Sequence, residues 1–219
     1  MRAFRLSARS VLVRSLGDRD PAALAEAVHR AAWPELEEAV AAYESVALYF
    51  RTAAPSPAEV LARLAGLEAG PARIGRVWEV PVCYQLGPDL REAAARLGLA
   101  ADDVVRLHAG REYRCHAVGF SPGFPYLGYL PEELCGLPRL ASPRPRVPAG
   151  SVGITGRQTC VYPSDTPGGW WLIGRTPLTV ASLREGRFPI RPGDRVKFRA
   201  IGQGDLDRML GRPLWDEST

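Results

Sequence analysis

Lysine is almost missing from this sequence: Lys197 is one of 28 basic residues, and all the others are arginines. Runs of like charge are also missing, because the arginines alternate with Asp and Glu along the chain, and the formal net charge is only +4. This scatter is typical of a solvated mixed-charge surface and lacks the basic stripe of a nucleic-acid-binding protein. We therefore expect no nucleic-acid partner.

Long apolar runs and closely paired cysteines are missing as well. No apolar stretch approaches the roughly 18–20 residues that cross a bilayer. The early apolar residues, where a signal peptide would lie, are interrupted by Arg2, Arg5, Arg9 and Arg14. The four cysteines lack the CxxC spacing of a metal or redox site; they are Cys83, Cys115, Cys135 and Cys160. We expect a cytoplasmic protein with free thiols, no membrane partner and no metal site.

What the chain does have is 20 prolines and 22 glycines, and most of the dense stretches lie after Tyr113. Such a share indicates either disorder or a turn-rich β structure. Aromatic and branched residues are interleaved with the prolines and glycines, which favours a folded β structure. With 219 residues, the chain can form one large or two small domains.

The first part of the chain alternates strand and helix patterns. Asp20-Pro21 and Ser56-Pro57 each start a helix, with a capping side chain before a proline, and Glu59 completes a capping box. The expected strands are Ser10–Ser15, Glu38–Tyr43, Val46–Phe50 and Arg73–Cys83. The order βαββαβ predicts a ferredoxin-like domain over residues 1–84. This region holds no convincing catalytic cluster.

The pattern changes in the second part, over residues 85–219. Asp89 is expected to cap a short helix, and a second short helix follows at about Ala101–Leu107. Short apolar runs separated by Pro and Gly then predict a β-barrel or sandwich. Its expected strands are Tyr113–Phe120, Ser151–Thr155, Thr159–Tyr162, Trp170–Arg175 and Arg195–Ile201. The fold class predicted for the whole chain is α+β.

Two loops of the second part could meet a ligand. The segment Gly119–Gly128 sets aromatics between glycines and prolines, where we expect no ordinary strand; they form either a stiff wall for a small ligand or a plug for the barrel end. In the next loop, prolines display Arg139 and Arg144, which suit a carboxylate or phosphate, and the Gly150-Ser151 N–H groups could meet an anion. The alternative is solvent-facing arginines beside a turn.

A third segment joins Gln158 to Thr176 and contains a Gly168-Gly169 turn before Trp170 and Trp171. Neighbouring side chains on a strand point to opposite faces, so one tryptophan should lie in the core and the other should line a surface.

Self-contained catalytic motifs are missing. The sequence has no P-loop, no HExxH and no nucleophile elbow. His108 could act as an acid–base or phosphate-binding group, but a lone histidine is more often structural. The chain therefore displays no hydrolase that could work by itself.

These segments resemble the family of the 5-oxoprolinase B subunit. The resemblance rests on three blocks: His108 and Tyr113 with GFSPGFPYLG at 119–128, then PRL…PRPRVPAGSV at 138–152, then YP…PGGW…IGRT at 162–176. It extends more loosely to nearly the whole chain. Cys160 departs from the family pattern, which has glycine there, and a positive φ at this position would strain the backbone. The family also includes a Kip-type inhibitor of a sporulation histidine kinase and a piece once labelled allophanate hydrolase subunit 1.

The resemblance implies an N-terminal ferredoxin-like domain and a C-terminal cyclophilin-like β-barrel. It also implies a larger 5-oxoprolinase partner, the C subunit, with which the chain would phosphorylate 5-oxoproline using ATP and Mg²⁺, with no tightly bound cofactor. The ring-opening A subunit would then complete the conversion to glutamate, and this chain alone would be inactive. The alternatives are a binding protein that inhibits a histidine kinase and a protein related to allophanate hydrolase and urea carboxylase.

We predict catalytic roles for three residues. His108 and Tyr113 would orient the substrate or shuttle a proton, and Arg144 would stabilise charge during transfer. The predicted substrate- or nucleotide-binding residues are Phe120, Pro122, Gly123, Phe124, Tyr126, Arg139, Pro148, Gly150, Ser151, Gln158, Tyr162, Gly168, Gly169, Trp170 and Arg175. We expect the active site at the interface with the partner, because this chain holds no complete catalytic set.

Overall fold

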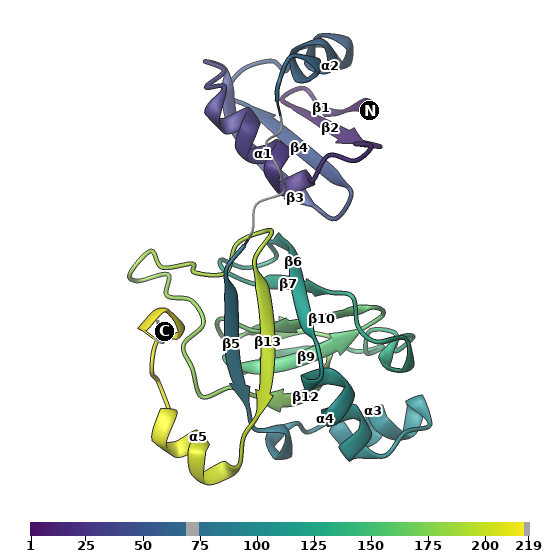
Figure 1. The fold of residues 1–219 in the computed structure, drawn as a ribbon, viewed down its shortest axis with the longest axis vertical. Coiled ribbons are helices and arrows are strands. Elements are labelled where there is room, and N and C mark those ends of the chain that lie inside the picture. The colour runs from purple at the N-terminus through teal and green to yellow at the C-terminus, as the bar shows by residue number, and fades with distance from the viewer. Residues whose placement is uncertain (69–74, 217–219) are drawn as a thin grey trace. The chain divides into compact units, whose positions relative to one another are not determined.

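The computed structural model describes residues 1–68 and 75–216. The chain divides into two compact units, Met1–Ile74 and Gly75–Thr219 (Figure 1). Both units contain helices and sheets, which confirms the predicted α+β class at this level.

The first unit is a four-stranded antiparallel sheet with the strand order β1-β2-β4-β3. Helix α1 packs against β3 and β4, and α2 contacts β1. The elements are β1 (Arg2–Ser7), β2 (Ser10–Arg14), α1 (Pro21–Arg30), β3 (Leu36–Ala42), β4 (Ser45–Phe50) and α2 (Pro57–Ala65). The buried core draws on alternate strand positions and on one face of α1, as Val11, Val13, Leu24, Val28 and Leu48 illustrate.

Both predicted helix starts are confirmed. The Asp20 carboxylate accepts a hydrogen bond from the Ala23 N–H at 3.0 Å, which caps α1. At α2, the Ser56 hydroxyl accepts from the Glu59 N–H at 3.2 Å, while the Glu59 carboxylate accepts from the Ser56 N–H at 2.7 Å. These bonds satisfy N–H groups that no helical carbonyl can reach, and so they set where each helix begins.

The predicted βαββαβ order is wrong in its last strand. Strand β5 (Val77–Val82) pairs in parallel with β13 (Arg195–Ala200) and therefore belongs to the second unit. The place beside β2 is taken by β1. The sequence did not predict this strand, because nearly all of its residues are exposed and its apolar and polar residues do not alternate. The division of the chain accordingly lies before β5, earlier than the predicted boundary after residue 84.

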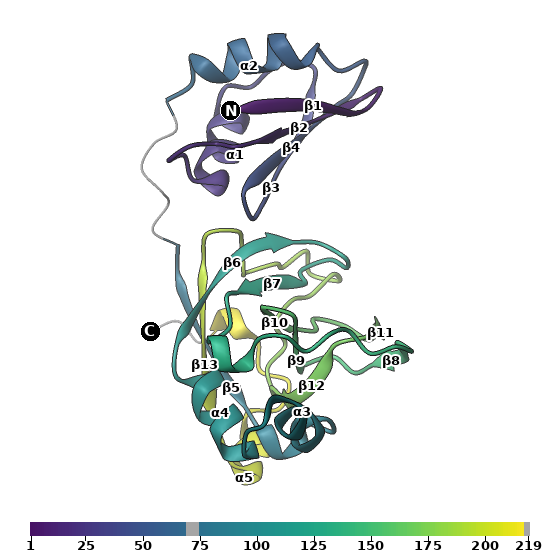
Figure 2. The ribbon, with the colours of Figure 1, turned by 90° about the vertical axis from the view of Figure 1, so that its right-hand side faces the viewer.

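The second unit is built on a seven-stranded sheet with the order β12-β9-β10-β7-β6-β13-β5. A two-stranded ribbon, β11-β8, stands beside it (Figure 2). The further strands are β6 (Glu112–Val118), β7 (Pro125–Gly128), β8 (Arg144–Val147), β9 (Ser151–Thr155), β10 (Gln158–Val161), β11 (Thr166–Gly168) and β12 (Trp171–Arg175). The helices are η1 (Tyr84–Leu86), α3 (Leu90–Leu97), α4 (Ala101–Ala109), η2 (Glu132–Leu134), α5 (Gln203–Met209) and η3 (Leu214–Asp216).

The two edges of the seven-stranded sheet meet and make it a nearly closed barrel. Cys83 follows β5 and Arg175 ends β12, and the two exchange backbone hydrogen bonds of 2.8 and 3.1 Å. These bonds pair the backbone at edges that would otherwise be open. The interior is filled by apolar residues such as Val80, Val152, Ile173 and Phe198.

The strands expected near Tyr113, Ser151, Thr159, Trp170 and Arg195 are confirmed within a few residues. In contrast, the expectation that the aromatic segment cannot form a strand is wrong, since β7 lies there between β6 and β10. Its proline, Pro125, is the first residue of the strand, where its missing N–H is tolerated. Within the described residues, no helix has both the length and the apolar character needed to cross a membrane.

Candidate functional site

An aromatic pocket of about 260 Å³ opens on the second unit. It brings together residues from all three sequence blocks: Phe120, Phe124, Tyr126, Arg139, Tyr162, Gly168, Gly169 and Trp170. Sequence reasoning missed Pro143 and Pro167, which also line the pocket, although both stand inside the conspicuous proline-rich segments. The pocket is the strongest candidate site because it unites segments that are far apart in the sequence.

Phe124 is the centre of the aromatic packing. Its ring centroid lies 5.1 Å from those of Tyr126 and Tyr162 and 5.8 Å from that of Trp170, all with rings edge to face. Phe124 is 1% exposed, whereas Phe120 is 64% exposed. Phe124 thus forms the buried centre of the aromatic cluster, and Phe120 stands at the rim, where an apolar ligand can contact it.

The hydroxyl of Tyr162 packs against the backbone of Gly168, which leaves room for it because glycine has no side chain. A Cβ atom at Gly168 would lie 2.5 Å from the Tyr162 Oη atom, so a larger residue cannot replace Gly168 without displacing the tyrosine. Burial raises the pKa of Tyr162 well above its ordinary value, and burial also raises the pKa of Tyr126. Both therefore keep their protons at neutral pH and can donate hydrogen bonds.

Arg139 supplies the positive charge of the pocket. Its side chain is exposed and has neither a hydrogen bond nor an ion pair within the described ranges. Its charge partly opposes the effect of burial on the pKa of Tyr126 and of Tyr162, which places it near both rings. An aromatic wall with one free guanidinium suits a small ring that carries a carboxylate.

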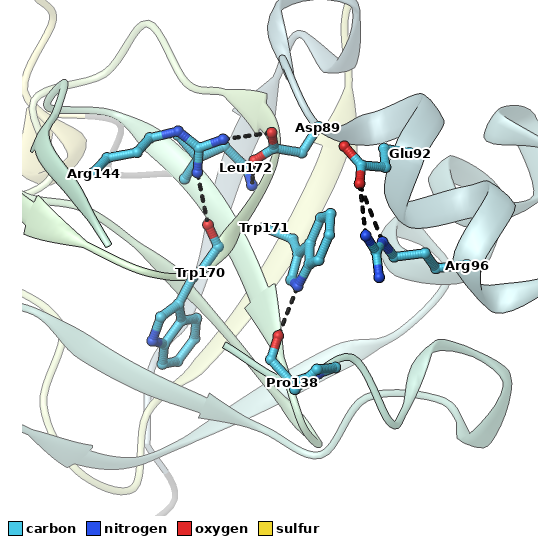
Figure 3. A network of polar contacts seen from close by, with 8 residues as sticks. All are labelled: Asp89, Glu92, Arg96, Pro138, Arg144, Trp170, Trp171 and Leu172. Atoms are coloured by element: carbon cyan, nitrogen blue, oxygen red, sulfur yellow. Dashed lines mark hydrogen bonds and ion pairs between the residues drawn. The ribbon is translucent and has the colours of Figure 1, made fainter. Parts of the chain in front are cut away.

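Arg144 has a different environment from the one predicted for it. Its Nη2 donates to Asp89 Oδ1 at 2.5 Å and its Nη1 to the Trp170 carbonyl oxygen at 3.4 Å (Figure 3). The other Asp89 oxygen accepts from the Leu172 N–H at 2.7 Å. Asp89 is thus the N-cap residue of α3 without capping it through its side chain. The pair ties β8 to α3 and β12, which gives Arg144 a structural role.

The two tryptophans point to opposite sides, as predicted. Trp170 lines the aromatic pocket, and Trp171 lies in the barrel core with its Nε1 donating to the Pro138 carbonyl oxygen at 2.7 Å (Figure 3). The guanidinium of Arg96, paired with Glu92, lies 4.9 Å from the Trp171 ring centroid. Adjacent tryptophans thus serve the pocket and the core separately.

His108 and Tyr113 lie in the barrel core, although the sequence suggested catalytic roles for them. The His108 ring is fully buried and hydrogen-bonds to Tyr84 Oη at 2.7 Å and to Thr159 Oγ1 at 2.8 Å. Tyr113 is equally buried and donates to the His108 carbonyl oxygen at 2.9 Å. With both ring nitrogens satisfied and no route to solvent, His108 contributes packing and hydrogen bonds.

Burial lowers the pKa of His108 from 6.5 to about 3, and this makes stability depend on pH. Unfolding exposes the ring, which takes up a proton below pH 6.5, so the free energy of unfolding should fall as pH drops from 6.5 towards 3. The slope from this residue approaches about 1.4 kcal/mol per pH unit. His108→Gln should remove that part of the slope. Urea unfolding of both proteins at pH 7, 5.5 and 4.5 measures it, and parallel pH curves would contradict the assignment.

The backbone of Gly150 and Ser151 is not available as the predicted anion cradle. The Gly150 N–H donates to the Tyr162 carbonyl oxygen at 2.8 Å, and the Ser151 N–H donates to that of Pro148 at 3.2 Å. Gly150 has φ +80°, and a Cβ there would lie 2.6 Å from the Thr176 carbonyl oxygen. The glycine therefore serves a tight turn into β9.

The other predicted residues lie outside the pocket lining. Pro122 is exposed, Gly123 is packed against Ala181, and Gln158 opens β10 opposite Thr155. The Arg175 side chain is exposed, while its backbone closes the barrel.

The departure at Cys160 causes no backbone strain. Cys160 is a fully buried residue of β10 and is not among the residues with positive φ. Gly153, opposite it on β9, leaves room for the sulfur: an added Cβ there would lie 3.4 Å from Cys160 Sγ.

The pocket does not fit ATP and Mg²⁺ through its own residues. Arg139 is its single cation, and it contains no carboxylate to hold the metal. Over residues 1–68 and 75–216, no group of three or more His, Cys, Asp or Glu side chains is placed to bind a metal ion. ATP and Mg²⁺ therefore stay predictions for an assembly with a partner.

The family model for the carboxyltransferase domain, subdomains C and D, matches residues 3–187. The chain belongs to this family. It is 48% identical over 133 residues to the B subunit of 5-oxoprolinase from Bacillus subtilis, which covers 59% of this chain and 55% of that protein. It is 54% identical over 126 residues to the protein of the same name from Escherichia coli O157:H7, covering 56% and 57%. The matches thus span little more than half the length of these curated relatives.

Solved structures support the family's fold over most of the chain. The crystal structure of TTHA0988 superposes with a TM-score of 0.76 and is 42% identical. The superposition covers 88% of this chain but only 40% of that one. In TTHA0988, the fold of this family is therefore part of a longer polypeptide.

Proposed function

We propose that this chain is the B subunit of an ATP-dependent 5-oxoprolinase and that it works with a larger partner. The curated relatives that carry this name support the proposal. The observation that carries it is the convergence of the three blocks on one aromatic pocket with a free arginine. The histidine-kinase inhibitor and the urea-related protein are not favoured, because the longer and more similar matches carry the 5-oxoprolinase name.

The pocket has the chemistry that 5-oxoproline requires. This substrate is a five-membered lactam with one carboxylate, so the ring can contact Phe120 and Trp170 while the carboxylate pairs with Arg139. The half-buried Tyr126 also lines the pocket, and its hydroxyl can donate to a lactam or carboxylate oxygen. The cavity of about 260 Å³ is small, as a compact metabolite requires.

The chain's proposed task is to bind and orient the substrate. Holding the reacting groups in position is a large part of catalysis in phosphoryl transfer, where the protein does little covalent chemistry. His108, Tyr113 and Arg144 support the pocket from the barrel core and from β8. The larger partner would bring the residues that hold ATP and Mg²⁺, and a third protein would complete ring opening.

We also propose a fold family for each of the two units. The nearly closed barrel supports a cyclophilin-like second domain. The order β1-β2-β4-β3 supports a ferredoxin-like first domain in which β1 replaces the usual last strand. The cysteines are free, which fits a cytoplasmic location.

The test is ATP hydrolysis by the chain with and without its co-expressed larger partner, each with and without 5-oxoproline. We expect turnover only when both the partner and 5-oxoproline are present. A well-formed complex that gives no 5-oxoproline-dependent turnover, even with the ring-opening protein supplied, would refute the proposal.

A further inference from the structure

A second pocket, of about 440 Å³, lies within the first unit and is lined by three arginines. Arg2 is on β1 and Arg14 on β2, and Arg19 precedes helix α1. Glu44 is the acidic residue of the lining, and it forms no ion pair with these arginines. The pocket is concave and carries net positive charge. No step of the proposed 5-oxoprolinase function uses it.

Arg2 and Arg14 are placed at a cost to stability. They are direct partners on the antiparallel β1–β2 ladder, where like charges repel each other. Neither side chain has a hydrogen bond or ion pair within residues 1–68 and 75–216, so no carboxylate contacts either guanidinium to offset the repulsion. An anion bound between the two guanidinium groups would compensate it.

Arg19 is held in a position from which it can bind the same anion. Its Nη1 donates to the Leu64 carbonyl oxygen at 2.9 Å, which holds the partly buried side chain in place. A guanidinium has five N–H donors in a planar fork, so this one bond leaves others to bind a ligand. A pre-ordered arginine loses less entropy on binding than a mobile one.

The turn that borders the pocket carries an unfavourable residue. Tyr43 and Glu44 form a two-residue hairpin loop between β3 and β4, and Tyr43 has φ +54°. Such loops normally contain Asn, Asp or Gly, and a bulky residue in this conformation is an outlier. Ser15, which also lines the pocket, has φ +54° as well. Backbone strain of this kind clusters at ligand sites.

We propose that the pocket formed by Arg2, Arg14 and Arg19 binds a phosphate-bearing small molecule. Three guanidinium groups around one concavity suit the several oxygens of a phosphate or pyrophosphate group. The exposed ring of Phe4 also lines the pocket and can stack on a planar group attached to the phosphates. This site is independent of the aromatic pocket and of the proposed 5-oxoprolinase activity.

The test is calorimetric titration of the full chain with inorganic pyrophosphate at constant ionic strength. We expect saturable binding that Arg14→Gln weakens by about tenfold or more, since one charge-assisted hydrogen-bonding group is lost. The matched control is Arg9→Gln, which removes the same charge from the same hairpin outside the pocket and should bind like the unmodified chain. ADP binding tighter than pyrophosphate would identify the ligand as a nucleotide, and equal binding would identify the phosphates alone; both support the site.

Thermal unfolding without ligand provides a second measurement. Arg14→Gln should unfold at a higher temperature than Arg9→Gln, because it relieves the repulsion from Arg2. Absence of saturable pyrophosphate binding, or equal weakening by Arg9→Gln and Arg14→Gln, would overturn the proposal.

Discussion

Asp89→Ala is expected to lower the free energy of unfolding by about 4 kcal/mol or more. The substitution leaves the Arg144 guanidinium without its carboxylate and the buried Leu172 N–H without an acceptor (Figure 3). Losing one partner of a largely buried ion pair costs about 3–5 kcal/mol, and an unsatisfied N–H costs about 1–3 kcal/mol. The Arg144 side chain is 30% exposed, so we take the lower end of the first range. Urea unfolding of the full chain measures the loss.

Two further variants separate these contributions. Asp89→Asn retains an oxygen for the Leu172 N–H but not the negative charge, so its loss should be intermediate. Glu92→Ala removes an exposed partner of Arg96 from the same helix and should change the stability by no more than about 0.5 kcal/mol. Equal losses for Asp89→Ala and Glu92→Ala would contradict the role assigned to Asp89.

Arg139→Ala is expected to lower kcat/KM for 5-oxoproline by about 100-fold in the assembled complex. The substitution removes the single cation of the aromatic pocket, and a bidentate pair with a carboxylate contributes roughly 2–3 kcal/mol. Because the side chain is exposed and has no partner within the described residues, folding and assembly should not change. Steady-state ATP hydrolysis at varied 5-oxoproline concentration measures the effect.

Arg146→Ala is the matched control for this experiment. Arg146 lies on the same proline-rich segment but pairs with Asp165 away from the pocket, so its loss should leave kcat/KM nearly unchanged. Arg139→Lys keeps the charge without the planar fork and should recover part of the loss. If Arg139→Ala matches Arg146→Ala in kcat/KM, Arg139 does not bind the carboxylate.

Local sequence patterns predicted where the helices and strands lie, but they did not predict which strands pair with each other. The capping side chains of Asp20 and Ser56 act within one helical turn, so the sequence was sufficient to place α1 and α2. Strand β5 was also recognisable, but its apolar residues would suit either unit. Only the pairing with β13 decides which sheet it joins.

In the candidate site, too, the sequence indicated the segments but not the contacts between them. Aromatics and arginines between prolines marked the segments that form the pocket, because prolines preset the backbone and display neighbouring side chains at low entropic cost. Their spacing did not show that Arg139 is free whereas Arg144 is paired with Asp89, a residue at the start of α3 that is far away in the sequence. Nor did it reveal that Tyr84 and Thr159 enclose His108.

The α+β class, the helix starts, most barrel strands and the three blocks that place the chain in its family could all be predicted from the sequence. Those features depend on interactions within a few residues or on blocks that are read directly. The sheet that β5 joins, the arginine that is free and the histidine that is buried became clear only from the three-dimensional fold. Each of these depends on contacts between residues far apart in the chain, and no local pattern encodes the partner.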